Sequence, residues 1–342
     1  VYLAAEVSSW EWNMEPLPGL GLDKVKGVVY KTVDGGKNWN KIWEGDNLAR
    51  YVWIHPQNHK LLYVSTGIFD REAANSDDAT KTPGGVGILR SGDGGQSWEV
   101  MNEANGLNAE ELYFGSLTLH PTKPNILLAA AGNDPYSTLL GKKLGGIYRT
   151  KDGGGTWSEV LDSADFSAVE FCEGDPNIAY AGSLDGFYRS KDAGLTWTET
   201  GGVAWGPPGM IAGFPIDIQC DPRDADRLFV NNYGGGNFLS EDGGYHWIDS
   251  SQGYSGGIMR DIEVPNTSAT QVYVTARSGI FTSRDGGTRW EGLNNGAARW
   301  MEMVALGINP DDARHLIIAN ADYGPTPLES RDGGRTWALI QT

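Results

Sequence analysis

Short segments of the chain alternate between apolar and polar residues, and turns rich in glycine and proline separate them. A period of two residues is typical of β-strands with one buried face. The segments recur in a fixed order: a first strand that ends near a proline, a second strand about six residues later, then a third and a fourth. First strands include Tyr51–Pro56, Leu117–Pro121 and Asp217–Pro222, and second strands include Leu61–Ser65, Ile126–Ala130 and Leu228–Asn231. This order predicts an all-β protein built from four-stranded antiparallel sheets.

An eight-residue segment of the form Ser/Thr-x-Asp-Gly/Ala-Gly-x-x-Trp occurs seven times, at intervals of about 40 to 60 residues, which is a period typical of propeller blades. Its Asp and hydroxyl can hydrogen-bond turn amides, its glycines supply positive φ, and its Trp opens the next strand. We therefore predict a hairpin turn and discount the seven aspartates as catalysts. The copies are Thr32–Trp39, Ser91–Trp98, Thr150–Trp157, Ser190–Trp197, Ser240–Trp247, Ser283–Trp290 and Ser330–Trp337.

The repeats predict a single domain over residues 1–342, a seven-bladed β-propeller with blades at approximately 1–45, 46–103, 104–162, 163–200, 201–250, 251–293 and 294–342. Val1–Ala4 aligns with the second strand of the other blades, so the first strand of blade 1 is missing. Either an N-terminal piece with that strand and an export signal lies outside this sequence, or blade 1 has three strands. We favour the first explanation, because an unpaired strand edge is a liability.

The octamers and the Ile-His-Pro end of the strand at 51–56 resemble the BNR/Asp-box repeat superfamily over essentially the whole chain, nearest to the xyloglucanase-like propellers of glycoside hydrolase family 74. The group also includes sialidases, sortilin-type receptors and photosystem assembly factors, so the resemblance implies the fold and leaves the function open. Sialidases have six blades and a Phe-Arg-Ile-Pro segment that this sequence lacks. Xyloglucanases pair two seven-bladed propellers, and this chain has one.

The same resemblance implies two further candidate catalytic residues. In the xyloglucanases a catalytic Asp ends a second strand in a Tyr-x-x-x-Asp context. Tyr2–Glu6 matches that spacing with Glu in place of Asp, and Asp322 enters the corresponding loop of blade 7, displaced by one residue. The resemblance therefore implies Glu6 and Asp322 as candidates.

Composition and motifs limit the ligands and partners that we expect for this protein. The net charge is −17, with 44 acidic and 27 basic residues, which disfavours nucleic acid. No apolar stretch approaches the roughly 18 residues of a membrane helix, so we expect no membrane insertion. The five histidines have no metal-binding spacing and no dinucleotide or phosphate-loop motif occurs, so we expect no metal and no cofactor. We expect Cys172 and Cys220 to be buried free thiols, with a disulfide between neighbouring blades as the alternative.

Long loops on the face opposite the octamers carry aromatic and charged residues, mainly in blades 1 to 3. Exposed rings beside carboxylates and amides suit sugars, because ring faces stack and polar rims bind hydroxyls. The alternative is that these aromatics only pack their loops; the clustering of the long loops favours binding. The predicted substrate-binding residues, from loops and first strands, are Trp10, Trp12, Arg50, Tyr51, Asp134, Tyr136, Trp205, Arg260, Arg299 and Trp300.

The first strands carry the main catalytic candidates. One face of these strands is apolar and the other is mixed, and the mixed face is expected to border an axial channel. Asp217 and Asp261 occupy equivalent positions there on neighbouring blades, beside Arg260. Two carboxyl groups can act as general acid and base at a glycosidic bond, roughly 6.5–9.5 Å apart in an inverting enzyme. The alternative is that both are solvated channel residues without a catalytic role.

Two functions follow from these residues. The first is a glycoside hydrolase, secreted, periplasmic or at the cell surface, that acts on a polysaccharide or oligosaccharide. The second is a non-catalytic propeller that binds a glycan or a protein on the same face. Neither the oligomeric state nor the sugar is predicted.

Overall fold

The computed structural model describes residues 1–8, 25–45, 49–67, 86–110, 112–132, 145–183, 186–202, 205–207, 215–232, 237–250, 259–276, 279–293, 303–320 and 327–340. The chain forms two compact units, which are described separately below. Unit 1 contains residues 1–171 and 190–197, and unit 2 contains 172–189 and 198–341. Apart from one 3₁₀ turn at Glu103–Asn105, the described regular structure is all β.

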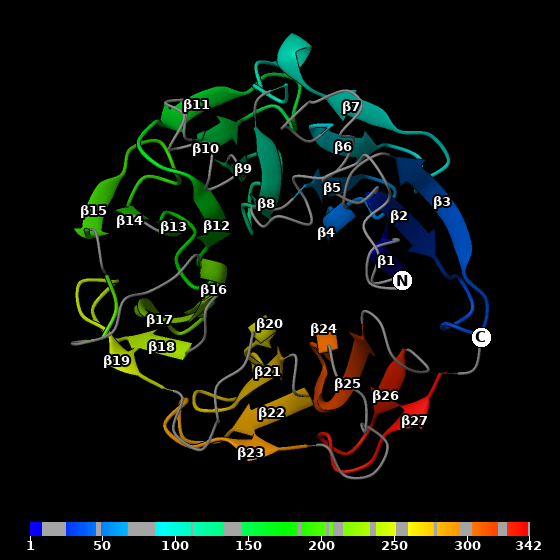
Figure 1. Ribbon diagram of the computed structural model, residues 1–342, viewed down its shortest axis with the longest axis vertical. Helices are drawn as coiled ribbons and strands as arrows, with labels where there is room; N and C mark the ends of the chain where they lie inside the picture. Colours follow the sequence, from blue (N-terminus) through cyan, green and yellow to red (C-terminus); the bar gives the residue numbers. More distant parts are fainter. Residues whose placement is uncertain are drawn as a thin grey trace, which may run out of the picture. The chain divides into compact units, whose positions relative to one another are not determined.

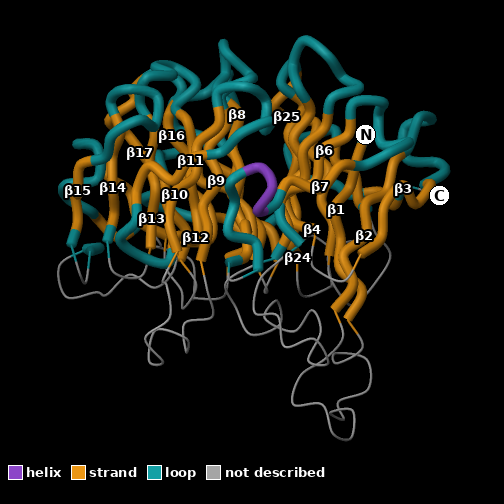
Figure 2. Tube along the Cα trace, turned by 90° about the horizontal axis from the view of Figure 1, so that it is seen from above, coloured by secondary structure: helices purple, strands orange, loops and turns teal. Residues whose placement is uncertain are grey.

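Unit 1 begins with a three-stranded sheet in the order β1-β2-β3. An eight-stranded sheet follows, in which the single pair Thr66↔Phe114 joins two antiparallel four-stranded groups, β4–β7 and β8–β11. Figure 2 shows β8 to β11 side by side. The strands are β1 Tyr2–Ser8, β2 Val25–Lys31, β3 Asn40–Gly45, β4 Ala49–Ile54, β5 Leu62–Thr66, β6 Ile88–Ser91, β7 Glu99–Met101, β8 Tyr113–Leu119, β9 Leu127–Gly132, β10 Gly145–Thr150 and β11 Ser158–Leu161.

Four sheets of four strands complete the described chain, in the orders β12-β13-β14-β15, β16-β17-β18-β19, β20-β21-β22-β23 and β24-β25-β26-β27. Each can be followed in Figure 1 as a run of neighbouring arrows. The strands are β12 Phe166–Phe171, β13 Ala179–Ser183, β14 Phe187–Ser190, β15 Thr198–Gly201, β16 Pro215–Asp221, β17 Asp224–Asn232, β18 Asn237–Ser240, β19 Ile248–Asp249, β20 Met259–Glu263, β21 Val272–Ala276, β22 Gly279–Ser283, β23 Glu291–Gly292, β24 Met303–Asn309, β25 Asp312–Asn320, β26 Leu328–Ser330 and β27 Ala338–Leu339. The predicted all-β class with four-stranded antiparallel sheets is confirmed.

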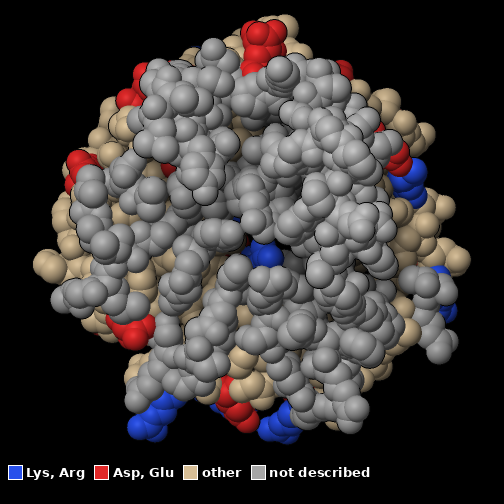
Figure 3. All heavy atoms as spheres, viewed as in Figure 1, with Lys and Arg blue, Asp and Glu red and all other residues tan. Residues whose placement is uncertain are grey.

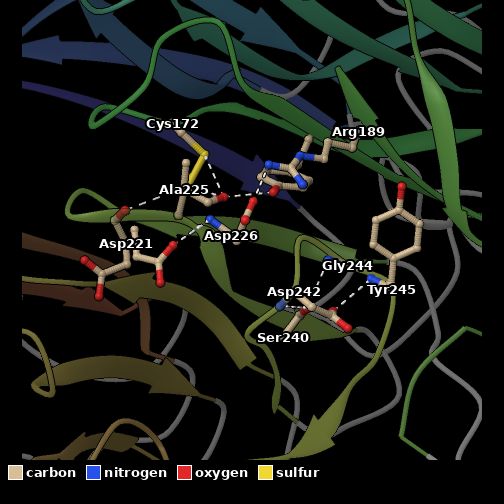
Figure 4. A network of polar contacts seen from close by, with 12 residues as sticks. Cys172, Arg189, Asp221, Ala225, Asp226, Ser240, Asp242, Gly244 and Tyr245 are labelled. Carbon is tan, nitrogen blue, oxygen red and sulfur yellow. Dashed lines mark hydrogen bonds and ion pairs between the residues drawn. A yellow bond between two sulfur atoms is a disulfide. The ribbon is translucent and has the colours of Figure 1, made fainter. Parts of the chain in front are cut away.

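The octamers form turns with one hydrogen-bond pattern, and we call them the octamer turns. In all seven, the amide of the fifth residue donates to the Ser or Thr hydroxyl at 2.8–3.0 Å. The hydroxyl in turn donates to the Asp carboxylate. Figure 4 shows this arrangement at Ser240, Asp242 and Gly244. The predicted structural role of the aspartates is confirmed, since their oxygens are used to hold the turn.

The apolar core lies between successive sheets. In unit 2, one cluster joins Phe229 of β17 to Ile262 of β20 and Val274 of β21, all nearly or fully buried. Each such side chain contributes about 1.5–3 kcal/mol on burial. Trp290, which ends an octamer turn, belongs to the same cluster. This packing aligns β16, β20 and β24 as neighbours within unit 2.

Candidate functional site

Asp217 and Asp261 lie at equivalent positions of two first strands in unit 2. Each is the first residue after a register shift, and each pairs with the second strand of its own sheet, Asp217 with Asn231 and Asp261 with Thr275. Each carboxylate accepts a hydrogen bond from the next backbone amide, at 3.0 Å and 2.9 Å respectively. Both side chains are half-buried, whereas the following Ile218 and Ile262 are fully buried. The predicted alternation of an apolar and a polar face is therefore present on both strands.

Asp261 also links two sheets. Its Oδ2 accepts a hydrogen bond of 2.7 Å from the amide of Leu306 on β24. Both of its oxygens therefore receive backbone N–H groups, which favour the charged carboxylate. Asp217 differs, since its Oδ2 lies 3.4 Å from Gln219 Nε2 on the same strand. Of the two predicted catalytic carboxylates, Asp261 thus has the more evident structural function.

Glu263 lies two residues after Asp261 on β20 and is half-buried. Burial, and then the charges of Asp261, Asp217 and Glu173, raise the pKa of Glu263 well above its usual range. No described residue donates a hydrogen bond to its carboxyl group. We call Asp217, Asp261, Glu263 and Glu173 the carboxylate cluster. Glu263 has the same strand parity as Asp261, but the sequence alone does not select it, because its pKa depends on residues from three separate segments.

A disulfide positions one member of the carboxylate cluster. Cys172 and Cys220 are bonded, with their Cα atoms 5.3 Å apart (Figure 4). The expectation of buried free thiols was wrong, and the alternative of a disulfide is correct. Cys220 lies on β16 with Asp217, and Cys172 directly precedes Glu173. The bond therefore holds the segment of Glu173 beside the strand of Asp217.

The segment after β16 is fixed by further polar contacts around the disulfide. Asp221 is buried and forms a bidentate ion pair with Arg223, at 2.9 Å and 3.1 Å. Tyr180 donates to the carbonyl of Ala225 at 2.8 Å, and Arg189 pairs with Asp226 (Figure 4). These contacts hold the turn between β16 and β17 beside the disulfide.

No protein-family model matches the chain, and no curated protein matches it. Solved structures do match. YCF48 bound to D1 peptide is 17% identical, with a TM-score of 0.58 over 86% of this chain and 81% of that one. YCF48 from Cyanidioschyzon merolae is 14% identical, with a TM-score of 0.59 over 98% of this chain and 88% of that one. An ancestral GH74 enzyme is 18% identical, with a TM-score of 0.59 over 92% of this chain but 52% of its own length.

The chain has a β-propeller fold. At these identities the likeness establishes the fold alone and does not extend to the chemistry. The chain spans about half of the length of the GH74 enzyme that it matches.

The other predicted site residues lie on β1, β4 and β20 or outside the described part of the chain. Arg50 and Tyr51 lie together on β4 of unit 1, with the Arg50 guanidinium 4.9 Å from the centre of the Tyr51 ring. Arg260 is half-buried on β20, beside Asp261. Glu6 lies on β1, but its side chain is outside the described residues. Also outside the described residues are Trp10, Trp12, Asp134, Tyr136, Arg299, Trp300 and Asp322.

Trp205 is not an exposed ligand contact. It is 4% exposed, and its indole N–H donates to the carbonyl of Ser183 at 2.8 Å. Its ring packs 5.0 Å from Phe187 and 5.2 Å from Trp247, measured between ring centres. An apolar ring with one N–H partner gains more from this interior than from solvent. The prediction that Trp205 binds substrate was therefore wrong, and the residue belongs to the core.

The described residues also bear on surface charge, metal binding and membrane insertion. In Figure 3 the described acidic and basic side chains are interspersed, and neither sign forms a continuous patch on the visible surface. Among the described residues, no group of three or more His, Cys, Asp or Glu side chains is arranged to hold a metal ion. No helix in the described part of the chain is long and apolar enough to cross a membrane.

Proposed function

We propose that this propeller has seven blades, one for each octamer turn, and acts as a secreted glycoside hydrolase through its carboxylate cluster. The observation that carries the proposal is the carboxylate cluster itself, in which burial and the charges of Asp261, Asp217 and Glu173 raise the pKa of Glu263. A carboxylic acid with a raised pKa beside a second carboxyl group is a usual basis for assigning a general acid and a general base.

Glu263 is the proposed general acid. Its raised pKa keeps a proton on the carboxyl group to higher pH than on an ordinary glutamate, and this proton is available for the glycosidic oxygen. Asp217 is the proposed base: it accepts a proton from water while the water oxygen bonds to the anomeric carbon and the bond to the leaving sugar breaks. Asp261 is assigned a positioning role, because its two amide partners already orient it.

Several observations support this assignment. The disulfide is typical of oxidising compartments, as expected of a secreted, periplasmic or cell-surface protein. A GH74 enzyme shares the fold, although this chain spans about half of its length. The predicted sugar contacts on the loops, together with Arg50, Tyr51 and Arg260, stay predictions; they would supply the stacking and hydroxyl contacts that the cluster lacks.

The test measures polysaccharide binding and release of reducing ends together, on a panel of plant and microbial polysaccharides. We expect Glu263→Gln and Asp217→Asn each to lower turnover by roughly 10²- to 10⁴-fold while binding is retained. Glu99→Gln is the matched control, since this glutamate is exposed on β7 of unit 1. Wild-type turnover in both cluster variants would exclude the cluster as the catalytic centre.

Non-catalytic binding of a glycan or a peptide is the second candidate. It is favoured by the use of both Asp261 oxygens in backbone hydrogen bonds and by the structural neighbour YCF48, which is bound to a peptide. This function predicts saturable binding without product release from any polysaccharide of the panel. Measurable release that Glu263→Gln abolishes would reject it.

A further inference from the structure

Two first strands of unit 1 end in a histidine whose ring holds the turn that follows. After β8, His120 Nδ1 accepts hydrogen bonds from the amides of Thr122 at 3.2 Å and Lys123 at 3.1 Å. After β4, His55 Nδ1 accepts from the amides two and three residues further along, both at 3.2 Å. Because two N–H groups point at Nδ1, the neutral ring of His120 carries its own proton on Nε2.

Two first strands of unit 2 use a different acceptor at the equivalent position. Asp221 Oδ1, at the end of β16, accepts from the amide of Arg223 at 3.0 Å. Asn309 Oδ1, at the end of β24, accepts from the amide of Asp311 at 2.9 Å. Although burial opposes it, hydrogen bonds from Arg223 lower the pKa of Asp221, and an amide oxygen does not titrate. Both oxygens therefore remain acceptors in mild acid, whereas an imidazole nitrogen stops accepting once it is protonated.

The surroundings of His120 favour its neutral form. Burial, and then the charges of Lys123 in the same turn and Arg149 on β10, lower the pKa of His120. The β9 strand has no charged residue, and β12 presents the ring of Phe171, whose centre lies 5.2 Å from that of the imidazole. A proton taken up at Nδ1 would place a charge in this apolar site and leave two backbone amides without their acceptor.

The turn that His120 holds is connected to other parts of unit 1. The carbonyl of Asn125 accepts a hydrogen bond of 2.9 Å from the amide of Gly153, in the octamer turn Thr150–Trp157. The carbonyl of Gly153 in turn accepts from the hydroxyl of Tyr63 on β5, at 3.0 Å. The His120 turn therefore supports a contact between the two groups of strands β4–β7 and β8–β11.

We propose that His120 is an acid-sensitive latch: a proton taken up from solvent at Nδ1 opens the turn at residues 120–126 and releases the octamer turn Thr150–Trp157 from it. The direction of the effect follows from linkage. The pKa of His120 in the closed form is below its ordinary value of 6.5, so the open form binds the proton more tightly. The closed latch is therefore fully favoured above about pH 6.5 and is lost progressively as the pH falls below that value. This inference does not depend on the proposed hydrolase activity.

The test combines NMR of ¹⁵N-labelled histidine with hydrogen exchange at about pH 7.5 and about pH 5, each exchange rate being divided by the intrinsic rate at that pH. We expect His120 to carry its proton on Nε2 at neutral pH. Between the two pH values, the protection of the Thr122, Lys123 and Gly153 amides should fall at least about tenfold, which is 1.4 kcal/mol, because two hydrogen bonds to the ring are lost. The capped amides after β16 and β24 are internal references and should keep their protection.

His120→Asn is the informative variant, because Asn309 caps the equivalent turn through its amide oxygen. This variant identifies the His120 signal by its absence, and it should hold the turn at both pH values and abolish the tenfold fall. His59→Asn is the matched control, since His59 is exposed in the turn after β4. It should leave the fall unchanged.

Three results would overturn the proposal. The first is a proton on Nδ1 of His120 at neutral pH, and the second is equal protection of Thr122 and Lys123 at both pH values. The third is a fall of the same size in the turns after β16 and β24, which would mean that acid destabilises the whole chain. A fall that persists in His120→Asn would assign the acid sensitivity to another group and reject the latch. If that variant does not fold, the tautomer of His120 and the comparison between turns in the wild type decide the question.

Discussion

Removing the disulfide between Cys172 and Cys220 should destabilise the chain by several kcal/mol. The two residues are 48 positions apart, so the bond closes a long loop in the unfolded state. The chain-entropy relation gives about 4 kcal/mol at 25 °C for a loop of this length. Measured values are often lower, because the reduced unfolded chain retains structure. We therefore expect a loss of about 2–4 kcal/mol in the free energy of unfolding.

Thiol titration and denaturant unfolding check this expectation. When it is unfolded in denaturant without a reductant, the protein should contain no thiol group that reacts with a thiol reagent. After reduction, the same titration should count two thiol groups per chain. Urea unfolding, followed by tryptophan fluorescence, then compares oxidised wild type, reduced wild type and the double variant Cys172→Ala/Cys220→Ala. Reduction separates the cross-link from the packing of the sulfur atoms, because it leaves both side chains in place.

Two outcomes would refute the reasoning. Two reactive thiols in the unreduced protein would mean that the bond does not form. Equal unfolding midpoints for oxidised and reduced wild type would mean that the bond forms but does not restrict the unfolded chain. A loss confined to the double variant would assign the effect to packing, since both cysteines are buried.

Three further expectations concern stability. Ala193 has φ 58° at the position where the other octamer turns have glycine, so Ala193→Gly should stabilise the fold by up to about 1 kcal/mol. The reverse substitution Gly35→Ala, at φ 74° with open space around the added Cβ, should destabilise the fold by about 1 kcal/mol. A urea unfolding midpoint that moves in the opposite direction for either variant would contradict this reasoning. Hydrogen bonds from the Thr336 side chain and amide lower the pKa of Asp332 to about 2. The stability that the ionised Asp332 contributes is therefore present above about pH 4 and is lost as the pH falls through 2. In Asp332→Asn, the urea unfolding midpoint measured from pH 2 to 6 should decline less at the acid end than in the wild type. Burial and neighbouring carboxylates raise the pKa of Glu263, so the free energy of unfolding should fall as the pH rises from about 4.5 through that raised pKa. Glu263→Gln should remove this decline. A variant with the same pH profile as the wild type would show that Glu263 does not titrate in this way.

The octamer turns could be predicted from the sequence because their interactions are local. The hydroxyl of Ser240 bonds to Asp242 and to the amide of Gly244, within five consecutive residues. The residue types and their order specify that geometry wherever they occur, and the period of the copies indicates a repeat array. The same holds for the alternation on the first strands, which placed Asp217 and Asp261 at equivalent positions.

The disulfide, the burial of Trp205 and the pKa of Glu263 were decided by the tertiary structure. Each depends on residues distant in sequence: Cys172 meets Cys220 across 48 positions, Trp205 donates to Ser183 across 22, and the charges of Asp217 and Glu173 act on Glu263. Composition made free thiols and an exposed tryptophan reasonable expectations, but only the packing of successive sheets determines which atoms meet. By itself, the sequence determined the turns, the strand pattern and the positions of two carboxylates. Because burial and neighbouring charges are properties of packed sheets, only the tertiary structure added Glu263 to the candidate site and removed Trp205 from it.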